Sequence, residues 1–251
     1  MMKNKKLGIY IHIPFCARKC NYCDFLSAPE TRETKERYLS LLDREMQLYK
    51  EIVSAREADT LFIGGGTPSF LETDLTDKLL CSVKKWIPSE NLKEFTIECN
   101  PNSVTEEKLN LYKEAGVTRI SLGMQSACDE ELKKLGRLHS VKEFEKTYEL
   151  VRKHGFERVN IDVMAAIPGQ TIESYKHTLE YVVGLSPEHI SSYSLIIEEG
   201  TPFYEKYREN PPVDEDTDRQ MYDLTKEILG RHGYHRYEIS NYAKEGQECI
   251  H

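Results

Sequence analysis

Short apolar segments typical of β-strands alternate with amphipathic segments typical of α-helices along most of the 251-residue chain. The expected strands lie at 7–13, 59–63, 95–99, 117–122, 159–163 and 190–197. The expected helices lie at 31–53, 71–86, 104–115, 129–135, 141–154 and 172–183. Units of this kind in series imply parallel strands that are joined by right-handed crossovers. The pattern therefore predicts an α/β fold, and periodicity alone leaves an open doubly wound sheet and a partial barrel as alternatives.

The helix expected at 104–115 has sequence patterns typical of helix caps at both of its ends. Ser103 and Glu106 form an S-x-x-E pattern, which predicts a capping box that opens the helix at 104. Gly116 is expected to end the same helix, because glycine readily adopts the left-handed conformation found after a helix C-terminus.

The alternation breaks at Asn-Pro-Pro, residues 210–212. Residues 214–229 have acidic side chains in the first turn and one apolar face, so we predict a helix that ends at Gly230 or Gly233. Residues 234–242 are expected to form one more strand. We therefore divide the chain into a barrel at 1–205 and the beginning of a C-terminal α+β domain at 206–251. The sequence stops at His251 without an evident structural close, which suggests a truncated chain.

Three cysteines crowd the loop that follows the first expected strand. Cys16, Cys20 and Cys23 have the spacing C-x3-C-x2-C, which lets the three thiolates converge on one point. Soft thiolate ligands select zinc or iron-sulfur clusters, and this spacing favours a cluster. His12 extends the pattern to H-x3-C-x3-C-x2-C, a possible tetrahedral set for structural zinc. A zinc-stapled structural or interaction domain is therefore the main alternative.

Other chemistry-bearing residues gather at the carboxyl ends of the expected strands. Gly-Gly-Gly-Thr-Pro at 64–68 follows the second strand, where bare backbone can approach a ligand closely. The sequence does not continue with Gly-Lys-Ser/Thr, which argues against a phosphate-binding P-loop. Glu98, Gln125 and Asp162 stand at or near the ends of later strands, where sites gather in barrels. The alternatives are an ordinary turn for the glycines and salt bridges inside the barrel for the charged residues.

Composition bounds the location and the partners of the chain. The formal net charge is -8 and no long basic block occurs, so nucleic-acid binding is not expected. The basic start at 1–6 precedes an apolar run too short for a signal peptide, and no run reaches membrane-spanning length. The odd number of seven cysteines argues against a disulfide framework. We therefore expect a cytoplasmic protein, with Cys81, Cys99, Cys128 and Cys249 as small buried residues.

Five short motifs carry a resemblance to a known family. They are Tyr-Ile-His-Ile-Pro-Phe-Cys at 10–16, Gly-Gly-Gly-Thr-Pro-Ser at 64–69, Ile-Glu-Cys-Asn-Pro at 97–101, Ser-Leu-Gly-Met-Gln-Ser at 121–126 and Ile-Pro-Gly-Gln-Thr at 167–171. In this order they resemble the radical S-adenosylmethionine (SAM) superfamily, and within it the family of the coproporphyrinogen oxidase HemN and the haem chaperone HemW. The resemblance implies a partial (β/α)6 barrel of the TIM-like radical SAM type.

The resemblance also implies cofactors and the residues that hold them. Cys16, Cys20 and Cys23 correspond to the ligands of three irons of a 4Fe-4S cluster, whose fourth iron is left for SAM. One electron from the reduced cluster then cleaves the sulfonium bond of SAM, so the protein's task is binding and orientation. The SAM-contacting positions carried over from the family are Tyr10, Tyr22, Gly65, Gly66, Thr67, Glu98, Gln125, Arg137 and Asp162. Salt bridges or plain core packing are the alternatives for Arg137, Tyr10 and Tyr22.

One departure separates the two branches of the family. The oxidases have one more cysteine in the pattern C-x3-C-x2-C-x-C, and this chain has Phe25 at that position. The resemblance therefore implies a haem chaperone that passes haem to acceptor proteins, with oxygen-independent coproporphyrinogen III oxidase activity as the alternative. His251 matches the first residue of a haem-linked motif of the chaperones. SAM, haem, haem-accepting proteins and an electron donor are the expected partners, and no residue is assigned a catalytic role.

Overall fold

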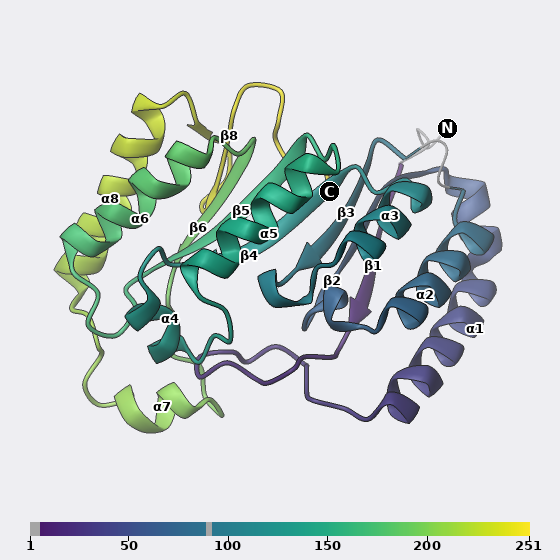
Figure 1. The fold of residues 1–251 in the computed structure, drawn as a ribbon, viewed down its shortest axis with the longest axis horizontal. Helices are drawn as coiled ribbons and strands as arrows, with labels where there is room; N and C mark the ends of the chain where they lie inside the picture. Colours follow the sequence, from purple (N-terminus) through teal and green to yellow (C-terminus); the bar gives the residue numbers. More distant parts are fainter. Residues whose placement is uncertain (1–5, 89–91) are drawn as a thin grey trace, which may run out of the picture.

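A computed structural model of the chain describes residues 6–88 and 92–251, and within these ranges one eight-stranded sheet organises the molecule (Figure 1). The basic N-terminal stretch at 1–5 lies outside the described residues. The strands are β1 (Leu7–Ile13), β2 (Ala58–Gly65), β3 (Glu94–Cys99), β4 (Arg119–Gln125), β5 (Arg158–Ala165), β6 (His189–Ser194), β7 (His235–Arg236) and β8 (Asn241–Ala243).

The order of the strands decides between the two predicted architectures. Strands β1 to β6 are parallel and lie side by side in chain order. A doubly wound sheet reverses its strand order at a switch point, and this sheet has no such reversal among its parallel strands. Successive right-handed crossovers therefore place the connecting helices on one face, which curls the sheet into a partial barrel. The predicted α/β class and the partial barrel are confirmed.

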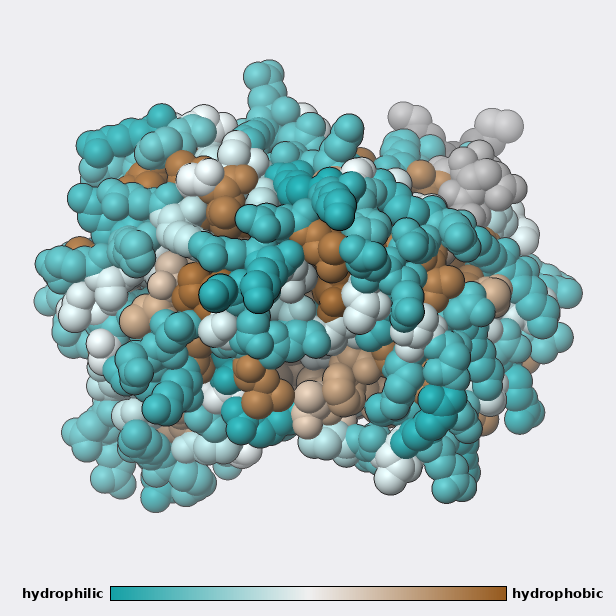
Figure 2. Space-filling model, viewed as in Figure 1, coloured by the Kyte–Doolittle hydropathy of each residue, from teal (hydrophilic) through white to brown (hydrophobic). Residues whose placement is uncertain are grey.

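The helices cover the outer face of this sheet, except that the short helix Pro202–Tyr207 lies beyond the carboxyl ends of the strands, beside the cysteine loop (Figure 1). They are α1 (Arg32–Arg56), α2 (Thr73–Trp86), α3 (Glu106–Ala115), α4 (Asp129–Leu135), α5 (Val141–Lys153), α6 (Ile172–Leu185), α7 (Pro202–Tyr207) and α8 (Glu215–Arg231). The 3-10 turns η1 (Pro68–Phe70) and η3 (Pro101–Ser103) follow β2 and β3. Figure 2 shows that polar side chains cover most of the face toward the viewer, with apolar side chains visible between them.

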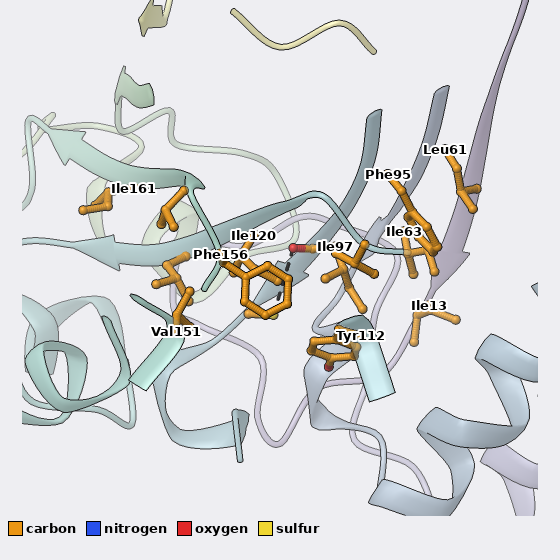
Figure 3. Packing of buried hydrophobic residues seen from close by; sticks show 14 of the residues in the cluster. Ile13, Leu61, Ile63, Phe95, Ile97, Tyr112, Ile120, Val151, Phe156 and Ile161 are labelled. Atoms are coloured by element: carbon orange, nitrogen blue, oxygen red, sulfur yellow. Dashed lines mark hydrogen bonds between the residues drawn. The ribbon is translucent and has the colours of Figure 1, made fainter. Parts of the chain in front are cut away.

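The hydrophobic core lies between the outer face of the sheet and the helices. In β1 the core-facing side chains of Ile11 and Ile13 are buried, whereas Tyr10 and His12 point to the inner face, because strand residues alternate between faces. Neighbouring strands and helix α3 fill the same layer, as Figure 3 shows for Ile97 and other labelled residues. The helices therefore hold the outer face, and the inner face is left for polar side chains.

The start of α3 corrects one prediction. The N-cap is Thr105, whose hydroxyl accepts a hydrogen bond from the Lys108 N–H at 3.3 Å, and not Ser103. Ser103 belongs to η3, and its hydroxyl donates to the Asn100 carbonyl at 2.8 Å. The serine is engaged by this turn, so the helix begins two residues later. Gly116 ends α3 in the left-handed conformation, with φ of 85°, as predicted.

The C-terminal part of the chain differs from its prediction in detail. Helix α8 runs through Gly230 to Arg231, and Gly233 follows with φ of 82°. The single strand expected at 234–242 is instead the antiparallel pair β7 and β8, with β8 added to the edge at β6. The Glu238 carboxylate accepts hydrogen bonds from the Ser240 N–H at 3.1 Å and the Asn241 side chain at 2.9 Å, which stabilises the turn between them.

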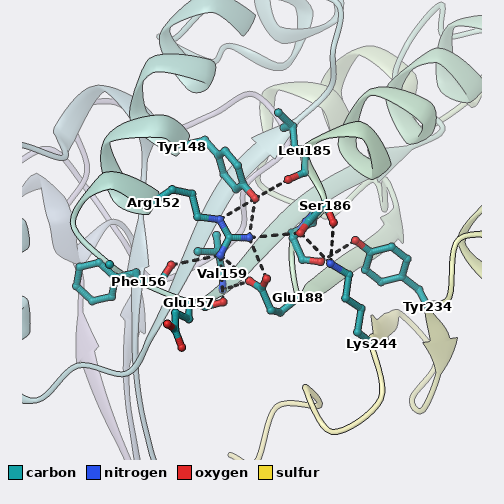
Figure 4. A network of polar contacts seen from close by, with 12 residues as sticks. Tyr148, Arg152, Phe156, Glu157, Val159, Leu185, Ser186, Glu188, Tyr234 and Lys244 are labelled. Atoms are coloured by element: carbon teal, nitrogen blue, oxygen red, sulfur yellow. Dashed lines mark hydrogen bonds and ion pairs between the residues drawn. The ribbon is translucent and has the colours of Figure 1, made fainter.

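Polar contacts fasten this C-terminal part to the barrel (Figure 4). Within the barrel, the Arg152 guanidinium of α5 pairs with Glu188 at 2.8 Å and donates to the Ser186 carbonyl at 3.4 Å, so it holds the segment to which the C-terminal part binds. Beyond β8, the Lys244 ammonium donates to the backbone and the side chain of Ser186 at 2.9 and 2.8 Å. Residues 206–251 therefore pack on the same sheet as the barrel, and their assignment to a separate C-terminal domain stays a prediction. None of the helices in the described ranges has both the length and the apolar character to cross a membrane.

Candidate functional site

The cysteine loop lies at the carboxyl ends of the parallel strands, where Figure 1 shows it as the purple trace below the arrowhead of β1. Cys16 is buried and Cys20 and Cys23 are half-buried, and all three are free thiols that line one cavity of about 720 Å³. The loop is held against α4, because Asn21 donates from its backbone to Leu135 at 3.0 Å and from its side chain to Lys134 at 2.8 Å. Tertiary contacts thus support a loop that has no regular structure of its own.

The structure disfavours zinc at this loop. Both ring nitrogens of His12 are engaged, with the Leu26 carbonyl at 2.9 Å and the Tyr10 hydroxyl at 3.2 Å. In the described part of the chain, no three metal-ligating side chains are arranged around a single ion. Without His12, the three thiolates are one ligand short of the closed four-ligand set of a structural zinc site. The donor set of this loop therefore fits a cluster better than it fits zinc.

The glycine turn after β2 forms one wall of the cavity. Gly65 has φ of 119°, and a β-carbon there would come within 2.7 Å of the His12 ring. A β-carbon on Gly66 would come within 2.9 Å of the Cys16 sulfur and 2.8 Å of the Phe15 carbonyl oxygen. The turn therefore requires glycine for its backbone conformation at one position and for contact with the cysteine loop at the next.

Two carboxylates share the cavity at the ends of β3 and β5. Glu98 accepts a hydrogen bond from the Gly65 N–H at 3.0 Å. Burial, and then the negative charge of Asp162, raise the pKa of Glu98 to about 7. Burial also raises the pKa of Asp162, although a 2.7 Å hydrogen bond from Asn160 opposes that shift. Both groups are therefore poised to gain from a cationic or hydrogen-bond-donating ligand.

Arg137 carries positive charge into the same cavity. Its guanidinium donates to the Gly123 carbonyl at 2.8 Å and to the Asn100 side chain at 3.0 Å, and it lies 3.9 Å from the Cys20 sulfur. Its Nε is buried and has no hydrogen-bond partner among the described residues. A buried donor without a partner is costly, so this atom is a candidate contact for an anionic group.

Gln125 and Tyr22 complete the predicted set on this wall. Gln125 has φ of 72°, an uncommon conformation for a residue with a side chain, and the register of β4 shifts beside it. Its side-chain oxygen accepts a hydrogen bond from the Tyr193 hydroxyl at 3.0 Å. Tyr22 lines the cavity from inside the cysteine loop and packs against a small apolar cluster that includes Leu135 and Phe203.

Two predicted site residues do not line this cavity. Tyr10 is 51% exposed on the inner face of β1 and stacks on the Phe62 ring with 5.9 Å between centroids. His251 lies toward the amino ends of the strands, where its Nδ1 is 2.8 Å from the Thr60 hydroxyl and its backbone N–H donates to Glu94. The remaining predicted residues, including Thr67 with its hydroxyl 3.6 Å from the Cys16 sulfur, meet in the cavity.

The structure adds residues that the motifs did not single out. Tyr193 at the end of β6 and Asn100 after β3 contact Gln125 and Arg137 respectively, and both line the cavity. Their position at or just after the end of a parallel strand was the available signal. Among the four scattered cysteines that were expected to be buried, only Cys99 is. Cys128 and Cys249 are half-buried and Cys81 is exposed on α2, so the expectation was wrong for these three.

The chain is similar in sequence to proteins of known family. Residues 10–182 match the family model described as the radical SAM superfamily. The heme chaperone HemW of Bacillus subtilis is 39% identical over 247 residues, which cover 96% of this chain and 65% of that protein. HemW of Escherichia coli is 37% identical over 254 residues, which cover 100% of this chain and 66% of that protein. The chain thus spans just under two thirds of the length of these relatives.

A solved structure shares the fold. The coproporphyrinogen III oxidase HemN of Escherichia coli, described as a radical SAM enzyme, matches with a TM-score of 0.87 and 22% identity. The match covers 97% of this chain and 57% of that one. At this identity the likeness is evidence for the fold alone.

Proposed function

Because the chain belongs to the radical SAM superfamily, we propose that it holds a 4Fe-4S cluster on Cys16, Cys20 and Cys23 and binds SAM beside it. The observation that carries the proposal is the single cavity lined by three free thiols, a glycine turn and two carboxylates. The cavity volume of about 720 Å³ lies within the range of small-molecule sites. When bound, the cluster supplies one electron for cleavage of the sulfonium bond of SAM.

Different residues around the cavity contact different parts of SAM. Gly65 and Gly66 present bare backbone to the methionyl part of SAM, because neither has a side chain that would keep the ligand away. Thr67 contacts SAM beside them. Arg137 offers a buried cation to the carboxylate of SAM, an arrangement supported by its unpartnered Nε. Asp162 accepts hydrogen bonds from the ribose hydroxyls.

The remaining predicted positions complete this ligand assignment. Glu98 and Gln125 contact SAM from the ends of β3 and β4, and Tyr22 is an aromatic neighbour of the adenine. Tyr10 stays a weaker candidate, because its side chain does not line the cavity.

We further propose that the whole protein acts as a haem chaperone, which binds haem and transfers it to acceptor proteins. The HemW relatives support this assignment. Phe25 supports it as well, since it occupies the position of the additional cysteine in the resembling oxidases, and its side chain is 62% exposed at the cavity. His251 is the candidate haem residue. Coproporphyrinogen III oxidase activity stays the alternative that the sequence resemblance left open.

Cluster binding is tested by anaerobic reconstitution with iron and sulfide. We expect one 4Fe-4S cluster per chain, with a visible spectrum that changes on addition of SAM. Cys16→Ala, Cys20→Ala and Cys23→Ala should each abolish stable cluster incorporation, because a cluster needs all three thiolates. Cys81→Ala, an exposed cysteine on α2, is the matched control and should incorporate iron normally. Normal cluster content in any of the three loop variants would refute the ligand assignment.

The two candidate functions are separated with the full-length protein. Haem titration followed by transfer to an apo-haemoprotein measures chaperone activity, and decarboxylation of coproporphyrinogen measures oxidase activity. We expect saturable haem binding that is weakened by His251→Ala, and no decarboxylation. Conversion of the porphyrinogen together with indifference to haem would overturn the chaperone assignment. We also propose that the protein is cytoplasmic and that an electron donor reduces its cluster.

A further inference from the structure

A continuous chain of hydrogen bonds runs from the mouth of the barrel to the C-terminal segment. The Asn160 side-chain amide donates to the Asp162 carboxylate at 2.7 Å. The Asn160 carbonyl oxygen lies 2.6 Å from His189 Nδ1, and His189 Nε2 lies 2.7 Å from the Tyr237 hydroxyl. The hydroxyl in turn accepts from the Cys249 backbone N–H at 3.2 Å. Asp162 lines the cavity, whereas Cys249 lies on the segment that ends beside Glu94.

The direction of donation along this chain is fixed by its first member. A carboxylate only accepts, so the Asn160 NH2 group must face Asp162, and its second hydrogen reaches the Ser121 hydroxyl at 2.8 Å. The Asn160 carbonyl oxygen therefore faces His189, which must donate from Nδ1. The histidine Nε2 is then left as an acceptor for the Tyr237 hydroxyl hydrogen. Every donor in the series points toward Asp162.

His189 keeps this arrangement because it stays neutral. Its side chain is buried, and burial together with the positive charges of Arg119 and Arg158 lowers the pKa of His189 to about 3. At neutral pH the ring therefore carries one hydrogen, on Nδ1, and offers a lone pair at Nε2. Only this tautomer satisfies Asn160 and Tyr237 at the same time.

We propose that His189 and Tyr237 are positioning residues that couple the Asp162 carboxylate at the cavity to the segment 237–251. The proposal rests on the proposed SAM site, because Asp162 is its contact with the ligand. In this series of hydrogen bonds, Asn160 holds one carboxylate oxygen of Asp162, so the other oxygen is left for the ligand. Coupling between two sites is reciprocal, so the ligand must in turn stabilise the hydrogen bond at Cys249.

The first test is the affinity of the cluster-loaded protein for SAM. Tyr237→Phe removes one hydroxyl from a partly exposed ring, and we expect it to weaken SAM binding about 3- to 10-fold, the loss of one hydrogen bond. Tyr181→Phe is the matched control, because its hydroxyl donates to Glu145 at 2.9 Å away from the cavity. Equal affinity of Tyr237→Phe and the wild type would contradict the proposal.

A second variant separates local support of Asn160 from coupling to the C-terminal segment. In His189→Asn the side-chain NH2 replaces Nδ1 as the donor to Asn160, but nothing replaces Nε2. We expect this variant to retain SAM affinity better than His189→Ala, while SAM no longer slows hydrogen exchange of the Cys249 amide. Slowing of that exchange by SAM in His189→Asn, to the wild-type extent, would refute the coupling.

A measurement on the ligand-free chain keeps this test distinct from the proposed function. The ¹⁵N shifts of the His189 ring report its tautomer, which should be protonated on Nδ1 alone. Asp162→Ala and Tyr237→Phe should each speed exchange of the Cys249 amide several-fold. Failure of the wild type to bind SAM would refute the proposed function only, whereas the opposite tautomer or unchanged exchange in both variants would refute the hydrogen-bond chain.

Discussion

Glu94 and Glu98 lie on the same face of the same strand, yet their surroundings are opposite. Glu94, at the amino end of β3, is 0% exposed and accepts hydrogen bonds from the backbone N–H groups of Ile250 and His251 at 3.2 and 3.4 Å. Arg158 pairs with it at 3.2 Å. Glu98, at the carboxyl end, has a single backbone hydrogen bond, from Gly65. One end of the barrel is therefore closed by paired charges, and the other presents unpaired ones.

The titration of the two carboxyl groups reflects this difference. Burial acts to raise the pKa of Glu94, but the charge of Arg119 and the hydrogen bonds from Cys249 and Ile250 lower it overall. Burial and the Asp162 charge raise the pKa of Glu98. Charges that are compensated inside the protein stabilise the fold, whereas uncompensated ones are retained where a ligand can compensate them. The amino end of the barrel is therefore closed by a structural lock, and the carboxyl end is the candidate binding site.

Removal of the Glu94 carboxylate should cause the largest loss of stability. Glu94→Ala leaves Arg158 and two backbone N–H groups unpaired, so we expect the free energy of unfolding to fall by about 3–5 kcal/mol. Urea unfolding of the ligand-free chain measures this loss. Glu227→Ala, which breaks an exposed pair with Arg231 on α8, is the control and should change it by less than about 0.5 kcal/mol. A loss at Glu94 no greater than at Glu227 would contradict the assignment of a lock.

A methyl group added at Gly66, in the wall of the cavity, should cause an intermediate loss of stability. In Gly66→Ala the new β-carbon meets the Cys16 sulfur and the Phe15 carbonyl at less than 3 Å. We expect a loss of about 2 kcal/mol in unfolding free energy and a lower iron content after reconstitution. Gly230→Ala, a helical position with open space around it, should instead stabilise the chain by about 0.5–1 kcal/mol. Full iron content in Gly66→Ala would show that the turn does not constrain the cluster loop.

The smallest expected effect is on the pH dependence of stability, which should differ in sign between Glu98 and Glu94. The pKa of Glu98 is raised from an ordinary value near 4.5 to about 7, so its contribution to stability is present below pH 4.5 and is lost as the pH rises through 7. Glu98→Gln removes this loss, so the stability of the variant relative to wild type should be higher at pH 8 than at pH 4.

Glu94→Gln should show the opposite dependence. The pKa of Glu94 is lowered, so its contribution is present above the ordinary value and is lost as the pH falls through the lowered one. The variant should therefore be less stable than wild type at pH 8, and the difference should shrink in acid. Urea unfolding at the two pH values checks both variants, and slopes of the same sign would contradict the comparison.

The fold was largely predictable because its signals are local. Apolar periodicity located the six parallel strands, and Gly116 ended its helix as expected. Predictions failed where a contact from another segment decided the outcome. The Ser103 hydroxyl is held by the Asn100 carbonyl and so does not cap α3. The strand expected at 234–242 is split by the turn that Glu238 stabilises.

The candidate site was predictable to a similar extent and for a similar reason. Residues at the ends of parallel strands must meet at one edge of the sheet, so Glu98, Gln125 and Asp162 were expected together and line one cavity. Their roles toward SAM stay predictions. The contact of Arg137 with Cys20, and the link from Asp162 to Tyr237, join segments whose relative position no short motif encodes.

The periods of the strands and helices and the crowding of three thiols on one loop follow from the sequence, because each depends on residues close together in the chain. The need for glycine at 65 and 66 was shown only by the folded chain, because the side chains that exclude a β-carbon there belong to β1 and the cysteine loop. The tertiary structure alone decided which charges are paired. Strand register and the curl of the sheet set the distance between side chains far apart in sequence. Two carboxylates four positions apart on β3 therefore differ, because Glu94 is buried and locks the barrel whereas Glu98 faces the candidate site.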